Sequence, residues 1–219
     1  MKNILAAVAL SIVLISASLA NAQAAPATPD PAIFVAIQKG DIAQVQLLLD
    51  QGTSIETKYT RGATALVAAS AMGKVEIVKL LLAKGANPDV RDDRGDTALH
   101  YAAMIGQIDE AKLLLAKGAN INLQEGDGLT PLMFSVVSGS PELVKLLLDN
   151  NAATEAADKH GFTALMAASG GGLTDVVKLL LAKGANINAK SDDGTTALQL
   201  ATSNGKPEVV ALLRSKGAQ

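Results

Sequence analysis

The chain has 219 residues, of which 49% are hydrophobic and 2% aromatic, with two histidines, no cysteine and a formal net charge of −2. Without cysteine the chain has neither disulfides nor a thiol nucleophile. The small net charge argues against nucleic acid or an anionic membrane surface as partner, because both select strongly basic proteins.

The first predicted element is a secretory signal peptide over residues 1–22. Lys2 is its only charge, an apolar run follows over residues 4–15, and the segment ends in the small residues Ala-Asn-Ala. This order is typical of export signals. The run is short of the ~20 apolar residues of a membrane span, so an uncleaved anchor is the alternative interpretation. We expect a mature chain that starts near Gln23 in the periplasm of a Gram-negative bacterium, with a flexible lead at 23–28 and no membrane span after cleavage.

Beyond this lead the sequence repeats with a fixed period. Five glycines stand 33 residues apart and open similar phrases: Gly62, Gly95, Gly128, Gly161 and Gly194. A second phrase, KLLLAKGAN or KLLLDNNAA, recurs at the same interval from Lys79, Lys112, Lys145 and Lys178. A fixed period without insertions indicates one small structural unit stacked on itself.

Residues 94–123 illustrate one such unit. Gly95 permits a tight turn, because glycine adopts backbone angles that a side chain forbids. Thr97 lies where a helix N-cap belongs, and Gly106 ends the first, short helix. A second amphipathic helix is predicted from the three-to-four spacing of Ile108, Ala111, Leu114 and Leu115. Gly118 then supplies a left-handed C-cap.

This unit resembles the ankyrin repeat, a β-turn followed by two antiparallel helices with a T-P-L-H-x-A phrase. TPLM at Thr130–Met133 keeps the proline of that phrase and TALH at Thr97–His100 keeps its histidine. The resemblance covers nearly all of the mature chain and implies an all-α repeat fold, an ankyrin-repeat solenoid of about six helix-turn-helix units with β-turn or hairpin fingers. The predicted domain is 29–219, with units of about 29–58, 59–91, 92–124, 125–157, 158–190 and 191–219.

Two kinds of position depart from the repeat pattern. Gln44 in the first unit and Arg214 in the last replace apolar residues, which suits terminal units with a polar outer face. Glu110 stands where Ile77 and Leu143 stand in neighbouring units, and we expect a partly exposed carboxylate there. The inter-repeat core is predicted to contain Leu81, Leu114, Leu147, Leu180 and Leu213.

The sequence offers no recognisable catalytic or cofactor motif. There is no GxSxG elbow and no GxxxxGK[ST] phosphate loop. His100 is expected to be a structural hydrogen-bonding group, and His160 a solvated turn residue, which leaves no ligand set for zinc. Asp92-Asp93 and Asp192-Asp193 resemble calcium ligands but lack the spacing of a calcium loop, so turn formation is the better interpretation. We expect a protein without cofactor that is not an enzyme.

The ankyrin resemblance implies a protein-binding module that contacts its partner through turn tips and first helices, and that is monomeric when unbound. Apolar side chains cluster at these positions with charges of both signs around them, although some could fold back into the core. The predicted partner-binding residues are Arg61, Met72, Arg94, Asp96, Tyr101, Met104, Ile105, Asp127, Leu129, Phe134, Val137, His160, Phe162 and Asp193.

Two functions are compatible with such a module. The first is that of an inhibitor or self-protection partner of a periplasmic enzyme such as a cell-wall hydrolase. The alternative is an accessory protein that supports an oxidative-stress enzyme in the periplasm. In both cases the row formed by Lys79, Lys112, Lys145 and Lys178 is expected to be solvated helix surface outside the binding face.

Overall fold

A computed structural model describes residues 32–219, so the predicted signal peptide and flexible lead lie outside the described residues. The described chain contains twelve α-helices, one short 3-10 helix and an isolated bridge between Ala157 and Thr163, and no strand. None of these helices is long and apolar enough to cross a membrane. The helices are α2 (Ala32–Lys39), α3 (Ile42–Asp50), η1 (Thr60–Gly62), α4 (Ala65–Ala71), α5 (Val75–Ala83), α6 (Ala98–Met104), α7 (Ile108–Ala116), α8 (Pro131–Val137), α9 (Pro141–Asp149), α10 (Ala164–Gly171), α11 (Thr174–Ala182), α12 (Ala197–Ser203) and α13 (Pro207–Ser215).

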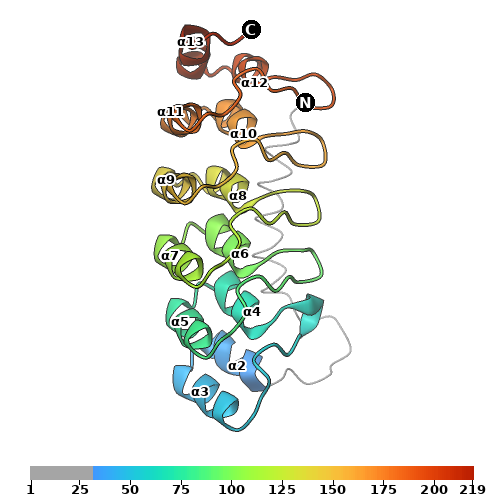
Figure 1. Cartoon of the computed structure of the whole chain (residues 1–219), viewed down its shortest axis with the longest axis vertical. Coiled ribbons are helices and arrows are strands. Elements are labelled where there is room, and N and C mark those ends of the chain that lie inside the picture. Colours follow the sequence, from blue (N-terminus) through green and yellow to red (C-terminus); the bar gives the residue numbers. More distant parts are fainter. Residues whose placement is uncertain (1–31) are drawn as a thin grey trace. The chain divides into compact units, whose positions relative to one another are not determined.

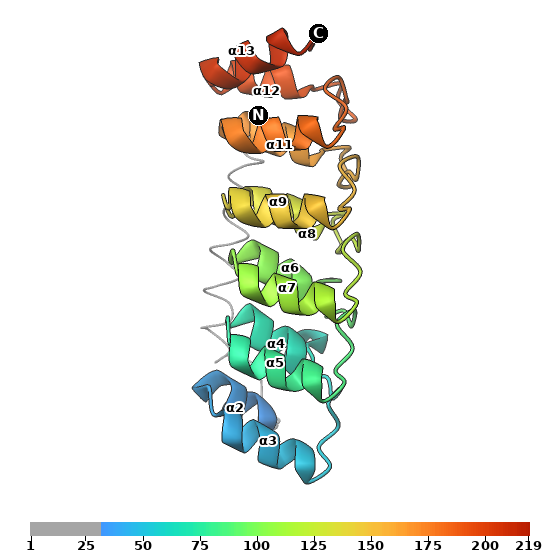
Figure 2. The same cartoon turned by 60° about the vertical axis from the view of Figure 1, so that its left-hand side comes forward.

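The helices follow the period of the sequence. The first helices α4, α6, α8, α10 and α12 begin 33 residues apart, and so do the second helices α5, α7, α9, α11 and α13. Each first helix is short and each second helix is longer, as predicted from Thr97, Gly106 and Gly118 (Figures 1 and 2). The all-α repeat fold is therefore confirmed, while the number of repeats stays a prediction.

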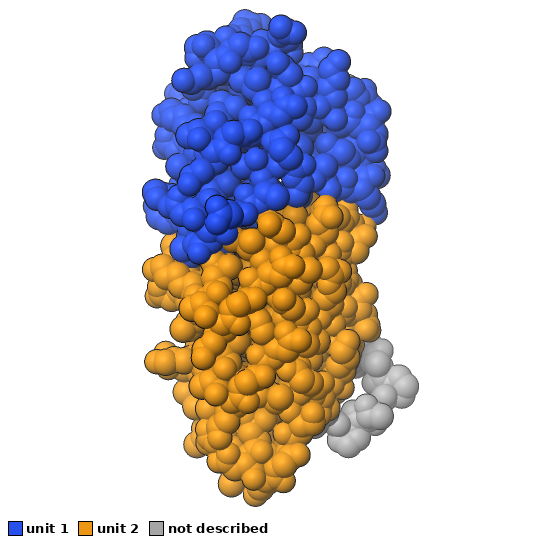
Figure 3. Space-filling model, in the orientation of Figure 1, with its two compact units in different colours: residues 1–26, 132–219 blue, residues 27–131 orange. Residues whose placement is uncertain are grey.

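The described residues form two compact units that divide between Pro131 and Leu132 (Figure 3). In unit 2, which ends at Pro131, α4 packs against α2, α5 and α6, and α5 packs against α3 and α7. In unit 1, residues 132–219, α10 packs against α11 and α12, and α11 packs against α9 and α13. Within each unit, first helices thus pack on first helices and second helices on second helices.

The core consists of the leucines and alanines that recur with the period. All five predicted core leucines are completely buried: Leu81, Leu114, Leu147, Leu180 and Leu213. Full burial of one leucine contributes roughly 1.5–3 kcal/mol relative to an exposed one. Ala98 and Ala102 on α6 are also completely buried, and their small side chains allow neighbouring helices to approach closely.

The segments between helix pairs form five turns that we call fingers 1 to 5: residues 56–63, 89–96, 122–129, 155–162 and 188–195. Within each unit, neighbouring fingers are joined by backbone hydrogen bonds. Asp93 N donates to Arg61 O at 2.8 Å and Gly126 N donates to Arg94 O at 2.7 Å in unit 2, and Asp192 N donates to His160 O at 3.0 Å in unit 1. A Cβ on Gly95 would lie 3.0 Å from Gly126 N, so this close approach requires glycine.

The expectation for Glu110 was wrong. Its side chain is 0% exposed, and neither carboxyl oxygen has a hydrogen-bond partner. Burial raises the pKa of Glu110 from 4.5 to about 7, and the only opposing influence is the neighbouring Ser70 hydroxyl on α4. The physical reason is that a second-helix position facing the preceding repeat is buried whatever residue occupies it.

The outer face of the first helix pair is less polar than expected. Gln44 is half-buried, whereas Ile42 and Leu47 on α3 are 43% and 49% exposed. Arg214 at the other end is exposed, as predicted.

Candidate functional site

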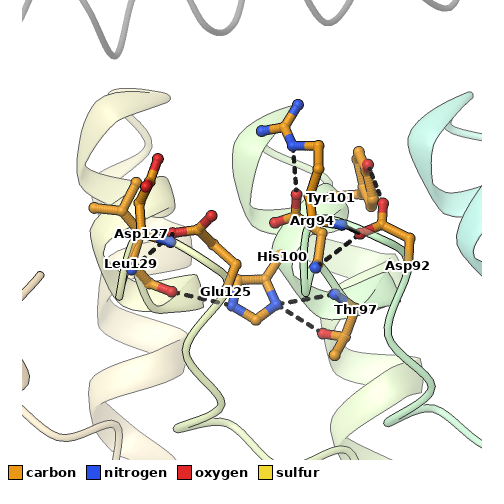
Figure 4. Close-up of polar contacts among 9 residues, drawn as sticks. Asp92, Arg94, Thr97, His100, Tyr101, Glu125, Asp127 and Leu129 are labelled. Atoms are coloured by element: carbon orange, nitrogen blue, oxygen red, sulfur yellow. Dashed lines mark hydrogen bonds and ion pairs between the residues drawn. The ribbon is translucent and has the colours of Figure 1, made fainter. Parts of the chain in front are cut away.

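The N-terminus of α6 is fixed by a capping box between Thr97 and His100 (Figure 4). Thr97 N donates to His100 Nδ1 at 3.1 Å, and the Thr97 hydroxyl lies 2.8 Å from the same nitrogen. Because a backbone N–H can only donate, Nδ1 is the acceptor and the ring proton is on Nε2. Nε2 then donates to Leu129 O in finger 3 at 3.3 Å. The structural role predicted for His100 is confirmed.

Burial keeps this imidazole neutral. It lowers the pKa of His100 from 6.5 to about 4. A neutral ring is what the bond geometry requires, since a protonated Nδ1 could not accept from Thr97. His100 thus links the start of α6 to the next finger rather than offering a free nitrogen to a ligand.

A second set of contacts holds finger 2 on α6 (Figure 4). Asp92 Oδ1 accepts from the backbone N–H groups of Arg94 and Asp96 at 2.9 and 3.0 Å. Asp92 Oδ2 accepts from the Tyr101 hydroxyl at 2.7 Å. Arg94 Nε lies 3.4 Å from Asp96 Oδ2. These contacts confirm the turn interpretation for Asp92.

Burial is the main cause of the pKa shifts of Asp96 and Tyr101 in these contacts. Burial raises the pKa of Asp96 from 3.8 to about 7; Arg94 opposes this shift, and Asp92, Glu125 and Asp127 add to it. The pKa of Tyr101 is raised by burial and by its bond to Asp92. Asp96 and Tyr101 therefore position finger 2, and neither side chain is presented to a partner.

Two further carboxylates that the sequence analysis overlooked shape fingers 3 and 4. Glu125 Oε1 accepts from Asp127 N and Leu129 N at 2.8 and 3.0 Å. In finger 4, Asp158 Oδ1 accepts from His160 N and Phe162 N, both at 2.8 Å. The signal was present in the sequence, because each acid stands three residues before a turn glycine, as Asp92 does.

The predicted partner-binding residues fall into three groups by exposure. Arg61, Ile105 and Asp127 in unit 2 and His160 and Asp193 in unit 1 are exposed. Met72, Arg94 and Leu129 in unit 2 and Val137 and Phe162 in unit 1 are half-buried. Asp96, Tyr101, Met104 and Phe134 are buried.

For these four buried residues the prediction of an accessible side chain was wrong. Every residue of α6 is buried, and so are residues 131–136 of α8. Within unit 2, α6 packs against the first helix α4 and its own second helix α7, and none of its residues is accessible. Accessible side chains therefore lie on the fingers and at the C-caps of the first helices, where Ile105 is 41% exposed.

Within residues 32–219 no three His, Asp or Glu side chains are grouped so that they could hold a metal ion. The accessible finger and C-cap side chains offer charge, hydrogen bonds and apolar area on a backbone fixed by hydrogen bonds. Such a surface is suited to contact with another macromolecule.

Comparison with known proteins agrees with this geometry. A family described as "Ankyrin repeats (3 copies)" matches residues 33–125, 111–191 and 157–219. The crystal structure of an ankyrin repeat domain from Acinetobacter baumannii AYE is similar, with 30% identity, a TM-score of 0.79, and coverage of 85% of this chain and 98% of that chain. The ankyrin repeat domain of Bcl-3, described as a unique member of the IkappaB protein family, has 30% identity, a TM-score of 0.78 and coverage of 87% of both chains. No curated protein sequence matches.

Proposed function

Because the chain belongs to the ankyrin-repeat family, whose domains generally mediate protein–protein interactions, we propose that it is a non-catalytic module that binds a partner protein through its fingers and first-helix C-caps. The observation that carries the proposal is the arrangement in unit 2. Exposed Ile105 and half-buried Met72 are C-caps of neighbouring first helices, and Arg61 and Asp127 are exposed on fingers of the same unit.

Two physical features favour this surface. The fingers are held by inter-finger backbone bonds and by carboxylates that accept from turn N–H groups, so little conformational entropy is lost when they are contacted. An exposed aliphatic side chain with charges nearby also matches the usual organisation of an interface, an apolar anchor within a polar rim.

The proposal includes export and the nature of the partner. The N-terminal sequence supports secretion to the periplasm, and the partner is then a periplasmic protein, such as a cell-wall hydrolase that the module inhibits or protects against. N-terminal sequencing of periplasmic protein checks export; a chain that starts near Gln23 is expected, and an intact Met1 in the cytosol would contradict it.

Binding is tested by affinity capture from a periplasmic extract, with mass spectrometry of the captured protein. Ile105→Asp should weaken capture of that protein about tenfold or more, because an apolar anchor commonly contributes about 2 kcal/mol. The melting temperature of the Ile105→Asp variant should hardly differ from that of wild type, since Ile105 is exposed. The matched control is Lys112→Asp on the second helix α7, an exposed position. Loss of capture in the control but not in Ile105→Asp would show that the face is misassigned.

A further inference from the structure

Fingers 1 and 2 of unit 2 carry cations that the fold itself does not neutralise. Lys58, Arg61 and Arg91 are exposed, and none of them forms an ion pair within residues 32–219. The two fingers lie against each other, because Lys58 Nζ donates to Arg91 O at 3.1 Å and Asp93 N donates to Arg61 O at 2.8 Å. We call Lys58, Arg61 and Arg91 the cationic patch.

Most acids of the same fingers are engaged in holding the backbone. Glu56 Oε1 accepts from Asn87 N at 2.7 Å, and Asp89 Oδ1 accepts from Asn120 N at 2.8 Å. Asp92 and Asp96 are buried in the contacts around Tyr101 and Arg94. Asp93 is the one acid of these two fingers that is exposed, so the accessible surface has an excess of positive charge.

Arg61 is held in a strained backbone conformation. Its φ is 63° and its ψ 28°, in the left-handed region that is unfavourable for residues other than glycine. The residues at the same position of the other fingers, Arg94, Asp127, His160 and Asp193, do not have a positive φ. Asparagine or glycine would tolerate this conformation better than arginine. Strain retained at an exposed charged residue points to a use for that side chain.

The anchoring of finger 1 is also different. Tyr59 stands where fingers 2, 3 and 4 have the turn-forming acid, and its ring packs against Phe34 of α2 with centroids 4.6 Å apart. An aromatic contact thus replaces a carboxylate at this position. The replacement removes one negative charge from the finger that carries Lys58 and Arg61.

Within unit 2 the positive charge of the finger tips ends at finger 2. Gln124 and Asp127 in finger 3 occupy the positions of Lys58 and Arg61. A long polyanion laid along the fingers would therefore meet exposed Asp127 within the same unit. Tyr59, the aromatic residue of finger 1, packs against Phe34 and offers no stacking platform for a nucleic-acid base.

We propose that the cationic patch binds a short acidic segment of the partner protein, with Arg61 and Arg91 pairing with its carboxylates. This inference rests on the proposed function and specifies the chemistry of the partner. Arginine is suited to this role because its planar guanidinium pairs with a carboxylate through two parallel hydrogen bonds. Unpaired surface charges also steer an oppositely charged partner toward its site.

The test uses the full mature chain and a fluorescent hexaglutamate peptide, with binding followed by fluorescence anisotropy at low salt and at about 0.15 M salt. The triple variant Lys58→Glu/Arg61→Glu/Arg91→Glu should weaken binding about tenfold or more, and the wild-type affinity should fall as salt rises. The control triple Lys79→Glu/Lys112→Glu/Lys117→Glu makes the same charge change at three exposed positions. Lys79 lies on α5, Lys112 on α7, and Lys117 at the C-cap of α7. It should stay within about threefold of wild type. Equal loss in both triples would overturn the proposal.

A single substitution separates binding from folding. Arg61→Asn removes the charge and suits the left-handed backbone, so the melting temperature should be unchanged or higher while hexaglutamate binding weakens. Unaltered binding by Arg61→Asn would contradict a role for this arginine. Tighter binding to anionic lipid vesicles or single-stranded DNA than to hexaglutamate would contradict an acidic protein segment as the ligand.

The captured periplasmic partner distinguishes the two proposals. Suppose that Ile105→Asp abolishes capture and the triple variant of the cationic patch does not. Then the proposal of an acidic segment fails and the proposed function stands. If neither variant affects capture, the proposed binding surface itself is wrong. Loss in both, with retention in the control triple, supports both.

Discussion

Glu110 on α7 in unit 2 and Val209 on α13 in unit 1 occupy the same position of the repeat. Both side chains are buried, and a serine with an unpartnered hydroxyl, Ser70 or Ser169, stands forty positions earlier in each case. Valine fills this position with hydrocarbon alone. Glutamate places two oxygens there without a hydrogen-bond partner.

The fold thus tolerates a buried polar group that has no hydrogen-bond partner in the core. A buried carboxyl without partners destabilises the folded state unless it takes up a proton. The raised pKa of Glu110 is the sign of that cost. Unit 2 therefore carries a destabilising group that depends on pH, and at this position of α13 unit 1 does not.

The largest expected effects come from leucines that the two units share, and they test whether the apolar cores are equivalent. Leu81 on α5 and Leu180 on α11 are completely buried. Both α5 and α11 have second-helix neighbours on two sides within their own unit. Leu81→Ala and Leu180→Ala should each lower the free energy of unfolding by about 2–5 kcal/mol, as large-to-small core changes do. Denaturant titration measures this. Losses that differ more than twofold would show that the units differ beyond Glu110.

The next effect comes from replacing Glu110 by an apolar residue and Val209 by glutamate. At pH 8, Glu110→Leu should raise the free energy of unfolding by about 3 kcal/mol, because each unit of pKa shift corresponds to about 1.4 kcal/mol. Val209→Glu should lower it by a similar amount, since it places the same carboxyl in the apolar surroundings of α13. The control Glu76→Leu, at an exposed position of α5, should change stability little. If Glu110→Leu were neutral, the carboxyl would not be the cause of the difference.

These residues also mark what the sequence could and could not predict. The 33-residue period predicted the helix pairs and the buried leucines, because both depend on spacing along one chain. The ankyrin resemblance predicted that His100 is a structural hydrogen-bonding group. The period could not predict the burial of Tyr101, Met104 and Phe134. The period assigns a position in the repeat, whereas burial depends on how many neighbours enclose that position.

Only part of the candidate surface could be predicted, because a position in the repeat does not by itself give its burial. Ile105 and the finger tips emerged from the repeat alignment, since turns and helix ends point away from neighbours. Glu110 was expected to be partly exposed and Glu125 was not considered, because an acidic residue is usually expected at the surface when its neighbours are unknown. The side chain of Glu125 is buried and accepts two backbone N–H groups of its own turn.

A related prediction concerns how the free energy of unfolding depends on pH. The unfolded carboxyl of Glu110 titrates near its ordinary 4.5 and the folded one near 7, so the folded state binds the extra proton between these values. The contribution of Glu110 to the free energy of unfolding is therefore most favourable below pH 4.5, and it is lost as the pH rises to about 7. Asp96 acts in the same direction and His100 in the opposite one.

Because these groups overlap, the measurement is a difference between two proteins. The free energy of unfolding of Glu110→Gln minus that of wild type should be near zero at pH 4 and grow to about 3 kcal/mol by pH 8. Urea titrations across this range give the difference directly. A constant difference would mean that Glu110 does not titrate in this interval.

The smallest effect compares the two capping boxes. Thr97 with His100 begins α6 in unit 2, and Thr196 with Gln199 begins α12 in unit 1, where Thr196 N donates to Gln199 Oε1 at 2.9 Å. Thr97→Ala and Thr196→Ala should each cost about 1 kcal/mol at pH 7, the usual value of an N-cap. In acid the two boxes should diverge. The folded pKa of His100 is about 4 against 6.5 for the free group, so its contribution is complete above pH 6.5 and is lost as pH falls toward 4. Glutamine does not titrate, and His100→Gln should therefore remove this acid-side loss. If both boxes responded alike to acid, the proton on His100 would have no part in holding α6.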